Sequence, residues 1–156
     1  MTARSLILLA TLGSAALLLG AYGFQHLGGL APCKMCLWQR WPHAAAILIG
    51  VAALALGRLS LAWLGALATV ATGAIGVYHA GVEWRFWAGP SSCSGGGLDM
   101  GAMTGADLLS MDAPSGLVMC DEIVWSFLGL SMAGWNAVVS FALAALWIMA
   151  AVRASR

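Results

Sequence analysis

Residues 59–82, with the sequence LSLAWLGALATVATGAIGVYHAGV, decide the fold class, because this run of 24 residues contains no charged side chain. A transmembrane helix needs roughly 20 consecutive, mainly apolar residues. The chain of 156 residues is 62% hydrophobic and only 8% charged, with a mean hydropathy of +0.90, whereas about a quarter of the residues of a soluble domain are charged. The sequence therefore predicts an integral membrane protein. Further uncharged runs cover residues 6–24, 41–57 and 123–152.

The four uncharged runs predict four transmembrane helices. We place these helices at residues 5–24, 37–57, 59–82 and 133–152. Short connections force successive helices to be antiparallel neighbours. The predicted fold is an all-α, antiparallel four-transmembrane-helix bundle, in a single membrane domain over residues 1–156, with loops over residues 25–36 and 83–132.

The uncharged runs alone do not set the ends of these helices. Starting the second helix near Leu37 places Arg40 in its first turn, where the long side chain reaches the membrane interface. The fourth run holds 30 residues, too many for one span, so residues 125–130 are expected in the interface. Apolar residues within 100–111 predict one or two helical turns on the membrane surface. The first run has 19 residues, more than the about 7–15 of a signal peptide, so we expect it to be retained.

The charges divide unequally between the two sides of the predicted bundle. One side carries no acidic residue and four arginines, which are Arg4, Arg58, Arg153 and Arg156. The opposite side carries Lys34, Arg40 and Arg85 together with all six acidic residues. Because cytoplasmic loops carry an excess of Lys and Arg, we expect both termini in the cytoplasm and all four cysteines outside.

Cys33 and Cys36 form a C-x-x-C pair at the mouth of the second predicted helix, and Cys93 and Cys120 lie in the long loop. Disulfides persist on the oxidising side of a membrane, so each pair is a candidate disulfide. The free N–H groups and the dipole of a helix N-terminus lower a thiol pKa, and Arg40 lies on the same helix face as Cys36. This pattern indicates electron transfer from thiols outside the membrane to a molecule dissolved in lipid.

Cys120 has different surroundings, because Asp121 and Glu122 follow it directly. Adjacent carboxylates raise the pKa of a thiol and disfavour its thiolate. Cys120 is therefore expected to be a poor leaving group when Cys93 is attacked, unless the fold supplies a compensating donor. The sequence does not show such a donor.

Other uses of four cysteines are less compatible with the spacing. Structural zinc sites usually combine two close-spaced pairs, and only one pair is close here. A c-type haem requires His directly after the second Cys of the motif, and this position holds Leu37. Purely structural disulfides stay open, although a bridge across C-x-x-C closes a very small ring and stabilises little.

The three histidines, His26, His43 and His79, are candidates of unequal weight. An ionisable residue at membrane depth is a functional candidate by default, whereas a His at a helix end is often only interfacial. His79 is favoured, because it falls near the outer end of the third run, level with the mouth of the second.

Taken together, these motifs resemble the DsbB family, bacterial inner-membrane proteins that generate disulfides. The combination of C-x-x-C, an Arg four residues later and F-L-G-L after the last Cys is specific, and the resemblance covers nearly the whole chain. The residues that carry it are Phe24-Gln25-His26, Pro32-Cys33-Lys34-Met35-Cys36, Gln39-Arg40, Cys93, Cys120, Trp125, Phe127-Leu128-Gly129-Leu130, Met132 and Trp135.

The resemblance implies a four-helix bundle in the bacterial inner membrane, with its cysteine pairs facing the periplasm. It implies that the protein reoxidises DsbA, a thioredoxin-like dithiol oxidase, and passes the electrons to ubiquinone or menaquinone. Cys93 would form the mixed disulfide with DsbA. Cys120 would then attack Cys33, freeing Cys36 as the thiolate that contacts the quinone.

The same resemblance implies cofactor-binding residues. Arg40 matches the quinone-proximal arginine of the family, and His79 matches a histidine linked to the quinone site, although its spacing from Cys93 differs by one residue. Gln39 stands where some members carry an acid, and we include it among the cofactor-binding candidates. No metal is expected.

Two alternatives stay open at this point. A vitamin-K-epoxide-reductase-like protein performs related chemistry on a similar bundle, but its C-x-x-C is expected after the loop cysteines, and here it precedes them. The other alternative is a non-enzymatic membrane protein with structural disulfides. Exchange with a thioredoxin-like partner distinguishes it from an oxidoreductase, because structural disulfides resist reduction.

Overall fold

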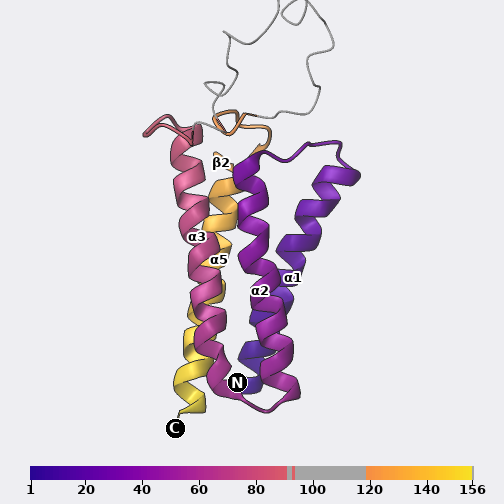
Figure 1. Ribbon diagram of the computed structural model, residues 1–156, viewed down its shortest axis with the longest axis vertical. Coiled ribbons are helices and arrows are strands. Elements are labelled where there is room, and N and C mark those ends of the chain that lie inside the picture. Colours follow the sequence, from indigo (N-terminus) through magenta and orange to yellow (C-terminus); the bar gives the residue numbers. More distant parts are fainter. Residues whose placement is uncertain (91–92, 94–118, 156) are drawn as a thin grey trace, which may run out of the picture.

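The computed structural model describes residues 1–90, 93 and 119–155, and within them four long helices form one bundle (Figure 1). The helices lie along the long axis, and both chain termini lie at the same end. A 3₁₀ turn, η1 (Leu59–Leu61), precedes the third long helix. The long helices are α1 (Ala3–His26), α2 (Lys34–Ala55), α3 (Ala62–Glu83) and α5 (Met132–Ala154).

Among the described residues, three helical segments are long and apolar enough to cross a membrane. Their most apolar windows have mean hydropathies of 1.9, 1.6 and 2.0 for α1, η1 with α3, and α5. This supports the prediction of a helical, multi-pass membrane protein. Helix α2 has 22 residues, enough for about 33 Å, but polar side chains interrupt its apolar character. A membrane span for α2 therefore stays a prediction.

The start of α2 differs most from the sequence prediction. The helix begins at Lys34 rather than Leu37 and ends at Ala55 rather than residue 57. Cys33 is its N-cap, and the Cys33 Sγ accepts a hydrogen bond of 3.2 Å from the Cys36 backbone N–H. Arg40 therefore lies in the second turn, and Pro42 lies inside the helix, which continues past it. Hydropathy alone misplaced this boundary because the Cys33 cap leaves no mark in a hydropathy pattern and Lys34 interrupts the apolar residues.

The other helices lie close to their predicted bounds. Helices α1 and α5 extend at most two residues beyond them, and α3 begins at Ala62 because η1 occupies the first three residues of the third uncharged run. The helical turns predicted within residues 100–111 lie outside the described residues.

Residues 125–130, predicted in the interface, include most of a short β-hairpin. Strand β1 (Ser126–Phe127) pairs antiparallel with β2 (Leu130–Ser131). Leu128 and Gly129 form the turn with φ values of 51° and 80°, the pair of positive φ angles that a type I′ hairpin turn requires. The Trp135 indole N–H donates to the Phe127 carbonyl at 2.9 Å, which holds the hairpin over the start of α5.

The end of the bundle that holds the termini is closely packed. Gly65 faces Trp147, and a Cβ atom at Gly65 would lie 2.6 Å from the indole ring. Small residues let membrane helices approach closely in this way. We call the buried cluster around Trp147 the terminal core; it contains Leu6, Ile7, Ala10, Ala53, Ala62, Ala66, Trp147, Ala150 and Ala151.

Candidate active site

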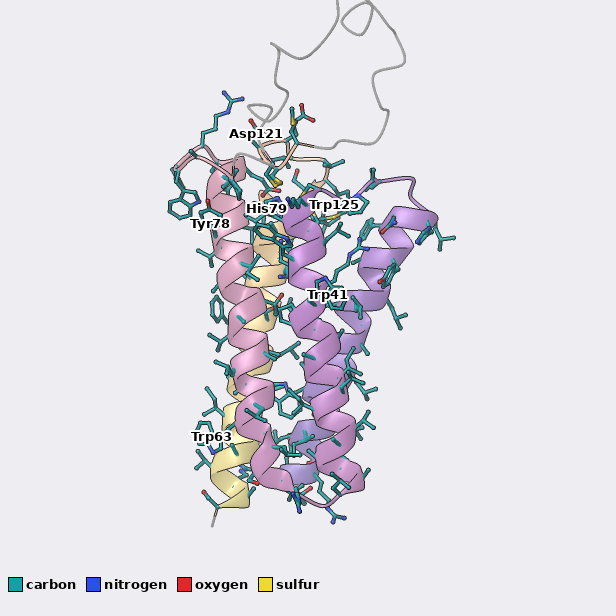
Figure 2. The ribbon with its side chains drawn as sticks, viewed as in Figure 1. Trp41, Trp63, Tyr78, His79, Asp121 and Trp125 are labelled. Carbon is teal, nitrogen blue, oxygen red and sulfur yellow. A yellow bond between two sulfur atoms is a disulfide. The ribbon has the colours of Figure 1, made fainter. Side chains whose placement is uncertain are left out.

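The four cysteines gather at the end of the bundle opposite the termini, near His79 and Asp121 (Figure 2). Cys93 and Cys120 form a disulfide with their Cα atoms 5.3 Å apart. Cys33 and Cys36 are free thiols whose Sγ atoms lie 2.8 Å apart. Cys33, Cys93 and Cys120 are each at most 5% exposed, and Cys36 is partly exposed. The Cys93–Cys120 pair and the Cys33–Cys36 pair thus form one sulfur cluster that is largely buried.

Cys33 and Cys120 are the members that bring the two pairs together. The Cys33 Sγ, the Cys120 Sγ and a ring nitrogen of His79 all lie within 4.8 Å of one another. A disulfide bond is about 2.05 Å long, so a movement of at most roughly 3 Å joins the Cys33 and Cys120 sulfurs. The sulfurs of Cys93, Cys120, Cys33 and Cys36 therefore form a continuous path.

The same three side chains are the potential metal ligands that bear on the zinc alternative. In the described part of the chain, Cys33, His79 and Cys120 are the group of three whose ligand atoms converge. Because Cys120 is in a disulfide, it presents no thiolate to a metal ion. This arrangement matches thiol–disulfide exchange better than metal coordination.

Cys33 also differs electrostatically from an isolated thiol. Its hydrogen bond with the Cys36 side chain and, second, its burial raise the pKa of Cys33 well above the usual range. Cys33 therefore keeps its proton and donates the hydrogen bond between the two thiols, and the Cys36 Sγ accepts it. This assigns different roles to two cysteines that are only three residues apart.

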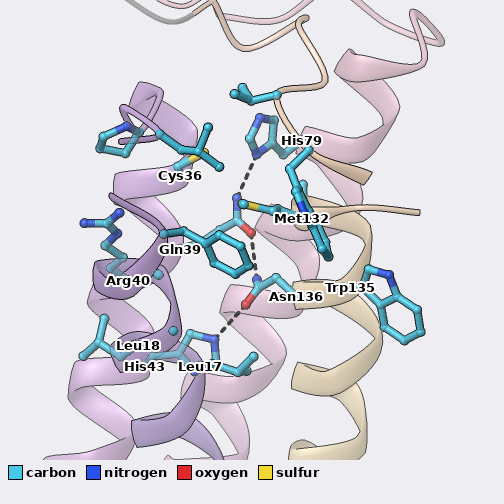
Figure 3. A pocket seen from close by; sticks show the side chains of 18 of the residues that line it. Leu17, Leu18, Cys36, Gln39, Arg40, His43, His79, Met132, Trp135 and Asn136 are labelled. Atoms are coloured by element: carbon cyan, nitrogen blue, oxygen red, sulfur yellow. Dashed lines mark hydrogen bonds between the residues drawn. The ribbon is translucent and has the colours of Figure 1, made fainter. Parts of the chain in front are cut away.

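Cys36 lines an apolar pocket of about 430 Å³ (Figure 3). The pocket lies between the second half of α1, the first half of α2, the start of α5 and the hairpin. Apolar and aromatic side chains form most of its wall, including Phe24 from α1, Trp125 and Phe127 from the hairpin region, and Met132 from α5. The sulfur path thus ends at a cavity suited to an apolar ligand.

Arg40 borders the pocket one turn beyond Cys36. Its Nη1 donates to the Gln25 Oε1 at 2.7 Å, and its guanidinium lies 4.8 Å from the centre of the Tyr22 ring. Both partners belong to α1, so they hold the side chain across the α1–α2 interface. The Nε of Arg40 is buried and has no hydrogen-bond partner in the described part of the chain. A charged donor is therefore fixed beside the pocket with one N–H free.

Four polar side chains form a chain of hydrogen bonds beside the pocket, in which Gln39, His43 and His79 are buried and Asn136 is partly exposed (Figure 3). The Gln39 Nε2 lies 2.9 Å from the His79 Nδ1. The Asn136 Nδ2 donates to the Gln39 Oε1 at 2.7 Å, and the Asn136 Oδ1 lies 2.9 Å from the His43 Nε2. We call His79, Gln39, Asn136 and His43 the polar chain. It connects α3, α2 and α5 from the cysteine cluster to the depth of His43.

Two backbone carbonyls fix the direction of the polar chain. The Met35 carbonyl accepts from the Gln39 Nε2 at 3.2 Å, and the Thr72 carbonyl accepts from the Asn136 Nδ2 at 3.4 Å. A carbonyl oxygen only accepts hydrogen bonds, so the Gln39 and Asn136 side chains must present their NH₂ groups to these carbonyls. His79 must then accept at Nδ1 and carry its hydrogen on Nε2, which lies 3.5 Å from the Cys33 Sγ.

Comparison with known proteins agrees with this site. Residues 3–150 match the family described as disulfide bond formation protein DsbB. The chain belongs to the DsbB family. Disulfide bond formation protein B of Verminephrobacter eiseniae is 35% identical, over 96% of this chain and 85% of its own length.

Two other relatives with the same name extend this likeness. The protein of Hahella chejuensis is 30% identical over 100% of this chain and 98% of its own length. The protein of Marinobacter nauticus is 34% identical over 88% of this chain and 85% of its own length. No solved structure matches the chain. Membership in the DsbB family makes the protein a membrane oxidoreductase of disulfide bond formation and confirms the resemblance seen in the sequence.

The DsbB-like residues proposed from sequence lie together with few exceptions. Arg40, Gln39 and His79 all line the pocket, as Cys36 does. His26 does not line it, because it stacks on Tyr22 with ring centroids 6.1 Å apart. This position matches the interfacial role that a helix-end His often has.

Sequence reasoning missed Asn136, which links two other members of the polar chain. The available signal was a carboxamide inside an uncharged membrane run, since polar groups at membrane depth are rare and functional. It also missed Glu83, whose carboxylate accepts from the Ser131 hydroxyl and lies 3.9 Å from the His79 Nε2. In the sequence, Glu83 directly follows the uncharged run 59–82, where charged residues are common, so nothing marked it as part of the site.

Proposed function

We propose that the protein is a thiol:quinone oxidoreductase of the bacterial inner membrane that reoxidises a periplasmic DsbA-like dithiol oxidase. Its electrons pass to a membrane quinone, either ubiquinone or menaquinone. The observation that carries this proposal is the buried sulfur path from Cys93 through Cys120 and Cys33 to Cys36, which ends at the apolar pocket.

The relay consists of successive thiol–disulfide exchanges. A thiolate of the partner attacks Cys93, breaks the Cys93–Cys120 bond and releases Cys120 as the thiolate. Cys120 then attacks Cys33 in an oxidised Cys33–Cys36 pair, and Cys36 leaves as the thiolate. The second thiol of the partner then resolves the mixed disulfide and frees Cys93, and Cys93 attacks Cys120, which restores the Cys93–Cys120 bond and releases Cys33. Each exchange breaks one S–S bond and forms another, so two electrons move from the partner to Cys33 and Cys36 for each dithiol oxidised.

Cys36, Arg40 and the apolar wall are the residues that would hold the quinone. The cavity of about 430 Å³ is within the usual range of ligand pockets, and the unpartnered Arg40 Nε is a donor suited to a carbonyl oxygen. When bound, a quinone would accept two electrons and two protons. Arg40 stabilises negative charge in this water-poor site and favours the thiolate of Cys36.

The orientation of the bundle follows from charge and connectivity. Both termini lie at one end, as an even number of spans requires, and α2 is the proposed fourth span. The arginine-rich end that holds the termini is assigned to the cytoplasm, and the cysteine cluster to the oxidising periplasm.

The test uses the purified full chain in detergent with a reduced DsbA-like oxidase and ubiquinone-1. We expect the absorbance of the quinone to fall in a one-to-one ratio with oxidation of the partner dithiol. Oxidation of the partner without loss of quinone would contradict the proposal. Complete resistance of the Cys93–Cys120 disulfide to the reduced partner would instead support a structural role for both cysteines.

A further inference from the structure

His43 has a combination of properties that the relay does not use. It is 3% exposed, and it lines the pocket. Its Nε2 pairs with the Asn136 Oδ1, whereas its Nδ1 is buried and has no hydrogen-bond partner among the residues that the structure describes. Buried polar groups are nearly always hydrogen-bonded. An unpartnered nitrogen in a pocket therefore points to a ligand atom that completes its bonding.

The polar chain decides what kind of atom the His43 Nδ1 can bind. Because the Thr72 carbonyl fixes the Asn136 amide, the Asn136 Oδ1 faces the His43 Nε2. This oxygen is an acceptor, so His43 must carry its hydrogen on Nε2. In the neutral imidazole the other nitrogen is an acceptor. The His43 Nδ1 therefore keeps a lone pair with no donor among the described residues, on a side chain that lines the pocket.

His43 also occupies the correct helix face. Cys36, Arg40 and His43 follow one another at i, i+4 and i+7, the spacing of one face of a helix, and they span about 10 Å along the axis. All three line the pocket. The free Arg40 Nε is a donor and the free His43 Nδ1 is an acceptor, so this face presents two unlike hydrogen-bonding groups.

We infer that the His43 Nδ1 accepts a hydrogen bond from a hydroxyl of the reduced quinone and so strengthens the binding of quinol but not of quinone. This inference rests on the proposed quinone function. The chemical reason is that a quinone presents carbonyl oxygens, which only accept, whereas a quinol presents hydroxyl groups, which also donate. An acceptor such as the His43 Nδ1 distinguishes these two redox states, and a donor such as Arg40 does not.

Two substitutions distinguish the proposed hydrogen bond at the His43 Nδ1 from the hydrogen bond between the His43 Nε2 and the Asn136 Oδ1. In His43→Gln, the side-chain amide nitrogen lies near the former Nε2 position and can still donate to Asn136, but the acceptor at the δ position is lost. In His43→Asn, the polar atom at the δ position is kept and the donor to Asn136 is lost. The matched control is His26→Gln, which changes a His outside the pocket.

The experiment measures equilibrium binding rather than turnover. All variants carry Cys36→Ser to prevent electron transfer, and the full chain is kept in detergent without oxygen. Quenching of tryptophan fluorescence gives the Kd of ubiquinone-1, because Trp125 and Trp135 line the pocket. Displacement of ubiquinone-1 by ubiquinol-1 gives the Kd of the quinol, and a thermal melt of each variant checks that it folds.

We expect His43→Gln to raise the Kd of ubiquinol-1 about five- to tenfold, the loss expected for one neutral hydrogen bond, with the Kd of ubiquinone-1 unchanged. His43→Asn should weaken quinol binding less, and His26→Gln should change neither value. Equal weakening of both ligands by His43→Gln, or no change in either, would overturn the inference. If the Cys36→Ser parent and the wild type bind neither ligand, the proposed quinone function itself fails.

Discussion

At the terminal core, Trp147 fills the space that Gly65 leaves open, whereas at the cysteine end the small residue Gly20 borders an open pocket. A Cβ atom at Gly65 would lie 2.6 Å from the Trp147 ring, but a Cβ atom at Gly20 would meet nothing within 4 Å. The polar chain also lies at the cysteine end. One end of the bundle is built for packing, and the other keeps space and polar atoms for a ligand.

The largest expected effect is at the last sulfur of the path. Cys36→Ser should abolish reduction of ubiquinone-1, because no thiolate remains at the pocket, while Cys93 still forms a mixed disulfide with the partner. The measurements are quinone absorbance and non-reducing electrophoresis. Cys93→Ser is the matched variant and should prevent the mixed disulfide. Undiminished quinone reduction by Cys36→Ser would end the relay hypothesis.

The two ends should also face different compartments. Single cysteines introduced at Arg58 and at Glu122, in a variant without native cysteines, should react with a membrane-impermeant maleimide from opposite sides. Position 58 should be labelled only from the cytoplasm and position 122 only from outside. The reversed pattern would place the native cysteines in a reducing compartment and contradict the oxidase proposal.

At the pocket, Arg40→Ala should raise the apparent KM for ubiquinone-1 about ten- to hundredfold, since a hydrogen bond from a charged group contributes about 1.5–3 kcal/mol. Binding of the DsbA-like partner should be unaffected. Arg40→Lys should recover only part of the loss, because a point charge cannot reproduce the planar guanidinium. Steady-state kinetics with varied quinone at saturating partner decide the question. An unchanged KM would mean that Arg40 is only an anchor between α1 and α2.

The smallest effects distinguish the two ends by packing. Gly65→Ala should destabilise the fold, since overpacking costs about 1–3 kcal/mol and the gain in helix propensity is about 1 kcal/mol. Gly20→Ala should keep that gain without overpacking. Thermal unfolding in detergent measures both variants. Equal stabilities would show that the terminal core adapts to added volume and that the contrast between the ends is weaker than the contacts indicate.

The sequence predicted the long helices well because each one is marked by a run of consecutive uncharged residues. Uncharged runs identified α1, α3 and α5 within a few residues, and the C-x-x-C motif identified the mouth of α2. The start of α2 was wrong, since the cap provided by Cys33 does not appear in a hydropathy pattern. The turn at Leu128 was also missed, because a positive φ is unusual for leucine.

The remaining part of the site depends on contacts between distant positions. Gln39 and Asn136 are 97 residues apart in sequence, and no local pattern relates them. The approach of Cys120 to Cys33 likewise requires the loop to return over the bundle. Such juxtapositions come from tertiary packing, so local patterns identified the four cysteines, and only the family resemblance implied that Cys120 approaches Cys33.

The uniform direction of the polar chain has an electrostatic consequence for Cys120. From His43 through Asn136 and Gln39 to His79, every bond donates in the same direction, so the bond dipoles add and the positive end lies at the His79 Nε2 hydrogen. Aligned hydrogen bonds polarise one another and strengthen the terminal donor. A ring nitrogen of His79 lies within 4.8 Å of the Cys120 Sγ. The polarised His79 therefore counters the negative potential of Asp121 and Glu122 at Cys120, and the Glu83 carboxylate, 3.9 Å from the His79 Nε2, opposes this effect. A ligand bound to the His43 Nδ1 would increase this positive potential at the Cys120 sulfur without touching Cys120.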